Sequence, residues 1–115
     1  MKKLILMIMV LVSGVIFAKG EPELEVVGQL VKATYYFENG AIQQVGYFKN
    51  GKLDGKWMSY NENGSVHSIA EYVDGKKSGN WQFYDNSYLV KEIIYSDNSV
   101  VAIKDFNNEQ TIVKN

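Results

Sequence analysis

The chain has 115 residues with 12 lysines and 13 acidic residues, and it contains neither arginine nor cysteine. A chain of this length forms one domain at most, and without cysteine that domain is held together by packing and hydrogen bonds rather than by disulfides. Nucleic-acid-binding proteins carry a clustered basic surplus, so this near-neutral, arginine-free composition argues against a nucleic-acid partner.

The first eighteen residues have the three-part plan of a secretory signal peptide. Met1-Lys2-Lys3 is a short basic start, residues 4–18 are almost entirely apolar, and small residues follow at Ala18 and Gly20. The apolar run is shorter than the about 20 residues that a membrane-spanning helix needs. We therefore expect cleavage after Ala18, with an uncleaved anchor as the alternative. A lipoprotein anchor is excluded, because no cysteine is present to carry the lipid.

The expected mature chain, residues 19–115, is a single domain that is secreted or periplasmic. It keeps 10 of the lysines and all 13 acidic residues, so its net charge is 10 − 13 = −3. A weakly acidic surface argues against binding to anionic lipid headgroups, and we expect no stable membrane insertion after signal cleavage.

Strand patterns separated by turn signals fill the mature chain. We expect a short strand at 24–27, a turn at Gly28-Gln29 and a longer strand at 30–37. Asn39-Gly40 predicts a type I′ hairpin turn, which needs positive φ at both central residues. Further strands are expected at 41–48, 53–60, 65–72 and 79–84, with turns at Gly51, Gly64 and Gly75. No segment after the signal has helical periodicity.

A period of 24 residues organises this pattern. The spacing relates Tyr36 to Tyr60 and Tyr84, Gly40 to Gly64, Gly51 to Gly75, Gly55 to Gly79, and Trp57 to Trp81. A fixed period of this length indicates a repeat architecture in which hairpins stack on their neighbours. We therefore expect an all-β fold, an elongated antiparallel β-meander. Residues 23–35 form its opening cap, 36–86 two good repeats and 87–113 a degenerate closing repeat.

Two further glycines and one asparagine have expected roles in this plan. Gly55 and Gly79 each lie two residues before a tryptophan, so we expect them to allow a bulge or to let an aromatic ring lie against bare backbone. Asn98 stands where the third copy would have its turn glycine, and asparagine is the next best residue at positive φ.

The same residues carry a resemblance to a known family. The pattern Tyr-x-x-x-Gly, followed by aromatic-x-x-Gly-Lys-x-x-Gly-x-Trp-x-x-Tyr, resembles the bacterial variant of the MORN repeat, found in small exported proteins and in chains described as antitoxin-like. The resemblance is good over residues 36–84 and loose over 87–105. It implies an elongated β-meander that serves as a scaffold or binding surface. Antitoxin action needs a cytoplasmic partner, against which the export signal argues.

Catalytic and metal-binding constellations are missing from the sequence. Chains that look like this one sometimes carry the label nicotinate-mononucleotide adenylyltransferase, but that chemistry uses a His-x-Gly-His type motif on a nucleotide-binding fold, and this chain has the single histidine His67. We interpret His67 as a half-exposed strand residue, and Glu38 and Glu62 as solubilising residues at equivalent turns. The aspartates match no calcium-binding spacing. We expect no catalytic residues, no metal and no cofactor.

The remaining candidate is a surface of aromatic side chains that recur with the repeat. The sequence predicts an aromatic ladder along the sheet and an interaction surface made of Tyr36, Trp57, Tyr60, Tyr72, Trp81 and Tyr84. The alternative is that these rings only pack the repeats together. We expect a non-enzymatic protein whose surface binds another envelope protein or a polysaccharide. The alternatives are the adenylyltransferase and a purely structural envelope protein.

Overall fold

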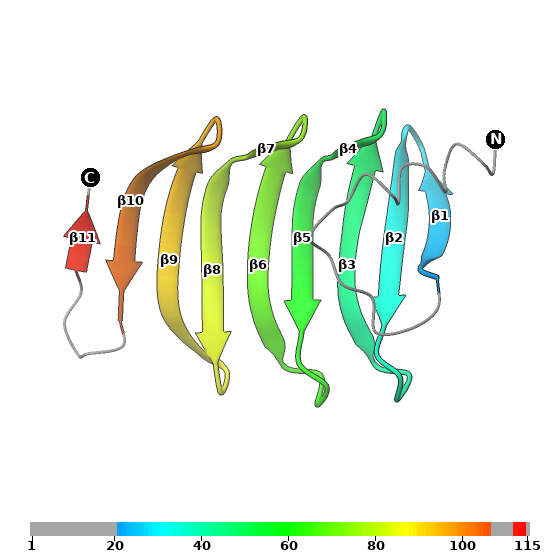
Figure 1. Ribbon diagram of the computed structural model, residues 1–115, viewed down its shortest axis with the longest axis horizontal. Coiled ribbons are helices and arrows are strands. Elements are labelled where there is room, and N and C mark those ends of the chain that lie inside the picture. Colours follow the sequence, from blue (N-terminus) through cyan, green and yellow to red (C-terminus); the bar gives the residue numbers. More distant parts are fainter. Residues whose placement is uncertain (1–20, 107–111, 115) are drawn as a thin grey trace.

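The computed structural model describes residues 21–106 and 112–114, and it places them in one antiparallel sheet (Figure 1). The strands of this part of the chain are β1 (Glu23–Val27), β2 (Leu30–Tyr36), β3 (Ile42–Lys49), β4 (Lys52–Leu53), β5 (Gly55–Tyr60), β6 (Val66–Val73), β7 (Lys76–Lys77), β8 (Gly79–Asp85), β9 (Tyr88–Ser96), β10 (Ser99–Asp105) and β11 (Ile112–Lys114). The predicted signal peptide, residues 1–18, lies outside the described residues.

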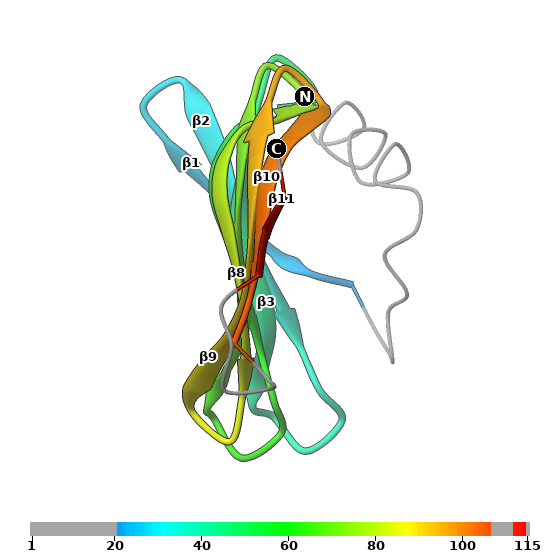
Figure 2. The same cartoon turned by 90° about the vertical axis from the view of Figure 1, so that its left-hand side faces the viewer.

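The strands follow one another across the sheet in chain order, so the predicted antiparallel meander is confirmed. The path runs β1-β2-β3-β5-β6-β8-β9-β10-β11, and the two-residue strands β4 and β7 pair with β3 and β6. Figure 2 shows a single twisted layer, from which the β1–β2 hairpin leans outward. Within the described ranges we find no helix with the length and hydropathy needed to cross a bilayer.

Three turns along the upper edge of the sheet in Figure 1, those after β3, β6 and β9, are of one kind. Both central residues have positive φ in Asn50-Gly51 (51° and 80°), in Asp74-Gly75 (54° and 85°) and in Asp97-Asn98 (53° and 74°). These are the φ signs of type I′ turns, which match the twist of the flanking strands. The prediction that Asn98 replaces a turn glycine at positive φ is confirmed.

The type I′ prediction for Asn39-Gly40 is wrong. Positive φ occurs at Gly40 (90°) but not at Asn39. The amide of Phe37 donates to the Ala41 carbonyl (2.8 Å), and the amide of Gly40 donates to the Phe37 carbonyl (3.0 Å). This is a three-residue loop with one left-handed residue, and the Asn39 side chain caps it by accepting from the Ala41 amide at 2.9 Å. The loop at residues 61–65 repeats these bonds.

The Asp74-Gly75 and Asp97-Asn98 turns are also tied to the short strand of the preceding repeat. The Gly75 amide donates to the Leu53 carbonyl (2.8 Å), and one repeat later the Asn98 amide donates to the Lys77 carbonyl (2.9 Å). Lysines of the same short strands reach the same turns, with Lys52 paired to Asp74 at 3.7 Å and Lys76 paired to Asp97 at 3.2 Å. Exposed pairs of this kind contribute little energy, so the backbone bonds fix the stacking of the repeats.

The pairing register assigns the side chains to two faces. Trp57 is opposite Ala70, and its neighbour Met58 is opposite Ile69; successive strand residues point to opposite faces. We call the face that carries Trp57 the aromatic face. Its buried cluster consists of Ala33, Tyr35, Phe48, Trp57 and Ala70, with Leu24, Val31, Leu53, Tyr72 and Trp81 packed against it. The opposite face carries the row Thr34, Val45, Met58, Ile69 and Gln82.

Gly46, rather than Gly55 or Gly79, is the glycine on which a ring lies. A Cβ atom added to Gly46 would overlap the Trp57 indole ring, whereas a Cβ on Gly55 would meet open space and one on Gly79 would meet the Glu71 carboxylate. Gly55 (φ 81°) and Gly79 (φ 69°) instead supply left-handed backbone where β4 passes into β5 and β7 into β8. The expectation that an aromatic ring lies against the backbone of Gly55 or Gly79 is therefore wrong.

Replacing Ser87 by glycine tests the last lower turn. This turn is one residue shorter than its predecessors, and it places Asn86 (φ 50°) and Ser87 (φ 69°) in left-handed backbone. A side chain is strained at such a position, so we expect Ser87→Gly to raise the free energy of unfolding by about 0.5–1 kcal/mol in urea titrations. Ser99→Gly, inside β10, is the control and should lower it. A destabilised Ser87→Gly variant would contradict this turn geometry.

Replacing Gly46 by alanine tests the ring platform. The added methyl group has no room beneath the Trp57 ring, so we expect Gly46→Ala to lower the free energy of unfolding by about 3 kcal/mol. The matched control is Ala70→Gly, at the equivalent position 24 residues later, which should cost only about 1–2 kcal/mol through backbone entropy and the loss of one buried methyl group. Equal costs for the two variants in urea unfolding would refute the assignment.

Candidate functional site

The two tryptophans share one set of contacts, to which Trp81 adds a second hydrogen bond from its Nε1 atom to the Ser78 carbonyl at 3.2 Å. The indole Nε1 of Trp57 donates to the Tyr47 carbonyl at 3.0 Å, and that of Trp81 donates to the Glu71 carbonyl at 3.0 Å. Phe48 packs edge-on against Trp57 with ring centroids 5.2 Å apart. Tyr72, 24 residues after Phe48, packs against Trp81 at the same separation. We call this arrangement the tryptophan clasp.

The first clasp is buried and the second is open. Trp57 is only 3% exposed, and the ring centroid of Tyr35 lies 6.4 Å from that of Trp57. Trp81, by contrast, is half-buried. Leu53 packs against the first cluster, and Lys77 occupies the equivalent position in the second repeat. The Lys77 ammonium lies 5.3 Å from the Trp81 ring centroid and 5.2 Å from that of Tyr95. A cation over two rings is favourable where the rings still contact water.

The residues around the second clasp form a continuous half-buried surface. Tyr95 lies 5.1 Å from Trp81 on the side away from Tyr72. Phe83, two residues after Trp81 on β8, points to the same face. Burial, and then the neighbouring Tyr95, raises the pKa of Tyr72. We call Tyr72, Lys77, Trp81, Phe83 and Tyr95 the open aromatic patch.

The structure divides the six aromatic residues of the predicted surface between the two faces. Trp57, Tyr72 and Trp81 lie on the aromatic face. Tyr36, Tyr60 and Tyr84 lie at or next to the ends of β2, β5 and β8, on the opposite face. There the Tyr36 hydroxyl donates to Glu23 Oε1 (2.7 Å) and the Tyr60 hydroxyl contacts Met58 Sδ (3.7 Å). Tyr60 follows Trp57 by three residues, and an odd separation on a strand changes the face.

Sequence reasoning missed five aromatic-face residues: Tyr35, Phe48, Lys77, Phe83 and Tyr95. A signal for two of them was present, because Phe48, Tyr72 and Tyr95 recur at spacings of 24 and 23 residues. Lys77 was recognisable only as the residue that replaces Leu53 of the first repeat.

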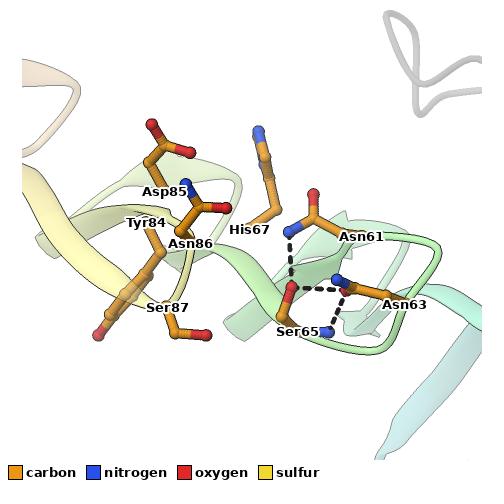
Figure 3. A pocket seen from close by; sticks show the side chains of 8 residues that line it. All are labelled: Asn61, Asn63, Ser65, His67, Tyr84, Asp85, Asn86 and Ser87. Carbon is orange, nitrogen blue, oxygen red and sulfur yellow. Dashed lines mark hydrogen bonds between the residues drawn. The ribbon is translucent and has the colours of Figure 1, made fainter.

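A second candidate is a polar cleft of about 640 Å³ at the lower edge of the sheet (Figure 3). It is lined by Asn61, Asn63, Ser65, His67, Tyr84, Asp85, Asn86 and Ser87. Asn61 Nδ2 donates to Ser65 Oγ at 2.9 Å, and Ser65 Oγ donates to Asn63 Oδ1 at 2.7 Å. Two asparagine side chains and a serine therefore hold one another in place across the turn that joins β5 to β6.

The cleft does not contain a recognisable catalytic arrangement. His67 is exposed, and the Ser65 hydroxyl gives its proton to Asn63 rather than to an imidazole. Glu38 and Glu62 lie exposed at the tips of different turns. In the part of the chain that the structure describes, no three histidine or acidic side chains come close enough to hold a metal ion.

The repeat can now be compared with known families. Residues 29–50 and 53–74 each match the model of a family described as MORN repeat variant. Two consecutive segments of the chain are therefore similar to MORN repeats. The first matched segment contains β2 and β3, and the second begins at Leu53 of β4 and contains β5 and β6. The matched segments therefore include the buried clasp and the start of the polar cleft, while Trp81 lies beyond them. No match to the chain was found among the curated proteins or among the solved structures. MORN repeats indicate a repeat-type binding or scaffold protein.

The buried hydroxyl of Tyr35 predicts an alkaline loss of stability. Burial raises the pKa of Tyr35 from 10 to about 12 in the folded state. Below pH 10 the hydroxyl is protonated in both states, so the stability of the folded state is not reduced. As the pH rises from 10 toward 12 the unfolded chain releases this proton more readily than the folded one, and the free energy of unfolding falls. Between these pH values we expect the wild type to lose about 2 kcal/mol more unfolding free energy than Tyr35→Phe, which keeps the ring and removes the ionisable group. Parallel pH profiles of the two proteins in urea unfolding would contradict the prediction.

Proposed function

We propose that this protein is an exported, non-enzymatic MORN-type repeat protein that binds another protein of the cell envelope through its open aromatic patch. The observation that carries the proposal is the contrast between the two clasps. The same contacts are sealed around Trp57 and left half-exposed around Trp81. Packing of the sheet explains a buried tryptophan, but it does not require a second one at the surface.

The composition of the open aromatic patch supports a protein partner. Tryptophan, tyrosine and phenylalanine provide large contact areas with few rotatable bonds, and they are enriched at the centres of protein interfaces. The Lys77 ammonium above Trp81 and Tyr95 adds one positive charge to this otherwise aromatic surface. A partner that places an acidic side chain beside an apolar one would satisfy both parts of the patch.

The export part of the proposal rests on residues 1–18, whose basic start, apolar run and small residues have the plan of a signal peptide. With this segment removed after Ala18, the aromatic patch would face an envelope or extracellular partner. If the segment is kept as an anchor, the same patch would face a partner at the membrane surface.

Site-specific photo-crosslinking tests the patch directly. The photoreactive analogue p-benzoylphenylalanine is placed at Phe83 on the aromatic face or, as a matched control, at the adjacent Gln82, which the strand points to the opposite face. After irradiation of cells that produce the full chain, we expect a discrete adduct with an envelope protein that is at least about tenfold stronger from position 83.

Equal adducts from positions 82 and 83 would contradict binding through this face. The absence of a discrete adduct from both positions would favour a purely structural role. An adduct found only in the cytoplasmic fraction would contradict export and leave the patch as the interaction surface.

A further inference from the structure

The polar cleft lies where the second repeat departs from the first. Asn61, Ser65 and His67 line it, and the residues 24 positions earlier are Phe37, Ala41 and Gln43. The two loops have the same backbone hydrogen bonds, from Phe37 to Ala41 and from Asn61 to Ser65, both at 2.8 Å. The fold therefore does not need Asn61, Ser65 and His67, because the first repeat builds the same loop with phenylalanine, alanine and glutamine at these positions.

The side-chain bonds orient the polar groups of the cleft. Because Asn61 Nδ2 is used by Ser65, its Oδ1 atom points away from the loop, toward the side on which the His67 ring stands (Figure 3). Asp85 and Asn86 stand on that same side in Figure 3, whereas the ring of Tyr84 points away. The cleft thus presents a held amide oxygen, a carboxylate and an imidazole around one space.

An exposed tyrosine stands beside these groups. Tyr88 is 75% exposed, the highest value among the exposed large hydrophobic residues of the described chain. It is the pairing partner of Asp85 across the turn that joins β8 to β9. Directly paired residues project from the same face with their Cβ atoms about 5 Å apart, so the Tyr88 ring flanks the cleft at Asp85.

The charges and groups of the cleft select a class of ligand. The eight lining residues include one carboxylate and no lysine, so an anionic ligand would be repelled. Amide and carboxylate oxygens accept hydrogen bonds from hydroxyl groups, and the amide nitrogen of Asn86 can donate to them. A volume of about 640 Å³ suits a small organic ligand. Hydroxyl-rich ligands with an apolar ring face can also pack on an exposed tyrosine.

We propose that this cleft binds a neutral carbohydrate, with Asn61, Asp85 and Asn86 bonded to its hydroxyl groups and Tyr88 packed against its ring. The site goes beyond the proposed protein-binding function, because it uses the turns at the lower edge of the sheet rather than the open aromatic patch. Either site can therefore fail its test while the other stands.

Calorimetric titration of protein produced from the full chain tests the proposal with four hexasaccharides. Maltohexaose, cellohexaose and chitohexaose are neutral, and hexagalacturonate is anionic. We expect binding of at least one neutral hexasaccharide and none of the anionic one. Tyr88→Ala and Asp85→Ala should each weaken binding at least about tenfold, and Tyr88→Phe should retain it because the ring is kept.

The sharpest variant restores the residues of the first repeat. Asn61→Phe, Ser65→Ala and His67→Gln together should abolish binding without loss of folding, since the first repeat forms this loop with those residues. Gln43→Ala, at the position that corresponds to His67, is the matched control and should bind like the wild type. Circular dichroism verifies that each variant is folded. Binding by the triple variant, or failure of the wild type to bind any neutral hexasaccharide at millimolar concentration, would overturn the proposal.

Discussion

The structure depends on the hydrogen bond from a tryptophan indole to a backbone carbonyl ten residues earlier. The Tyr47 carbonyl accepts from both Trp57 Nε1 and the Asp54 amide, each at 3.0 Å, and the Glu71 carbonyl accepts in the same way from Trp81 and Ser78. A carbonyl oxygen has two lone pairs, so both bonds can form. These bonds hold the chain against the strand that precedes the turn. The change of direction is possible because a glycine in left-handed backbone, Gly55 or Gly79, stands between each short strand and the strand that follows it. A sheet of one layer gains its apolar core in this way.

The two clasps have their contacts in common because they occupy equivalent positions of the repeat. They differ in exposure where the residues of the two repeats differ. In the first repeat Gly46 lets the Trp57 ring lie on the backbone, and Leu53 and Tyr35 close its edges. In the second, Ala70 and Lys77 take the places of Gly46 and Leu53, and the ring remains half-exposed. The polar residues of the lower cleft are likewise substitutions within a shared loop. We therefore propose that binding uses surfaces where the two copies diverge, at Lys77 in the open aromatic patch and at Asn61, Ser65 and His67 in the polar cleft.

Much of the fold followed from local rules, and the errors have physical causes. The all-β meander was predictable because Asn-Gly and Asp-Gly pairs recur between strand-like segments. The turn at Asn39-Gly40 was mispredicted because the dipeptide also fits a three-residue loop, and loop length is fixed by pairing rather than by the dipeptide. A ring was expected to lie against the backbone of Gly55 or Gly79 because these glycines precede the tryptophans. The Trp57 ring instead lies on Gly46 of the neighbouring strand β3. Tyr60 was grouped with Trp57 because the repeat was considered without the alternation of faces. Sequence alone also could not separate a sealed clasp from an open one, since that depends on neighbours on other strands.

The central claim is that one clasp is dry and its copy is open to solvent. Acrylamide quenching of tryptophan fluorescence in Trp57→Phe and Trp81→Phe measures this directly, because each variant keeps a single indole. The account predicts that Trp57, observed in Trp81→Phe, emits at shorter wavelength and is quenched several-fold less than Trp81, observed in Trp57→Phe. Equal quenching of the two folded variants, or stronger quenching of Trp57, would contradict it.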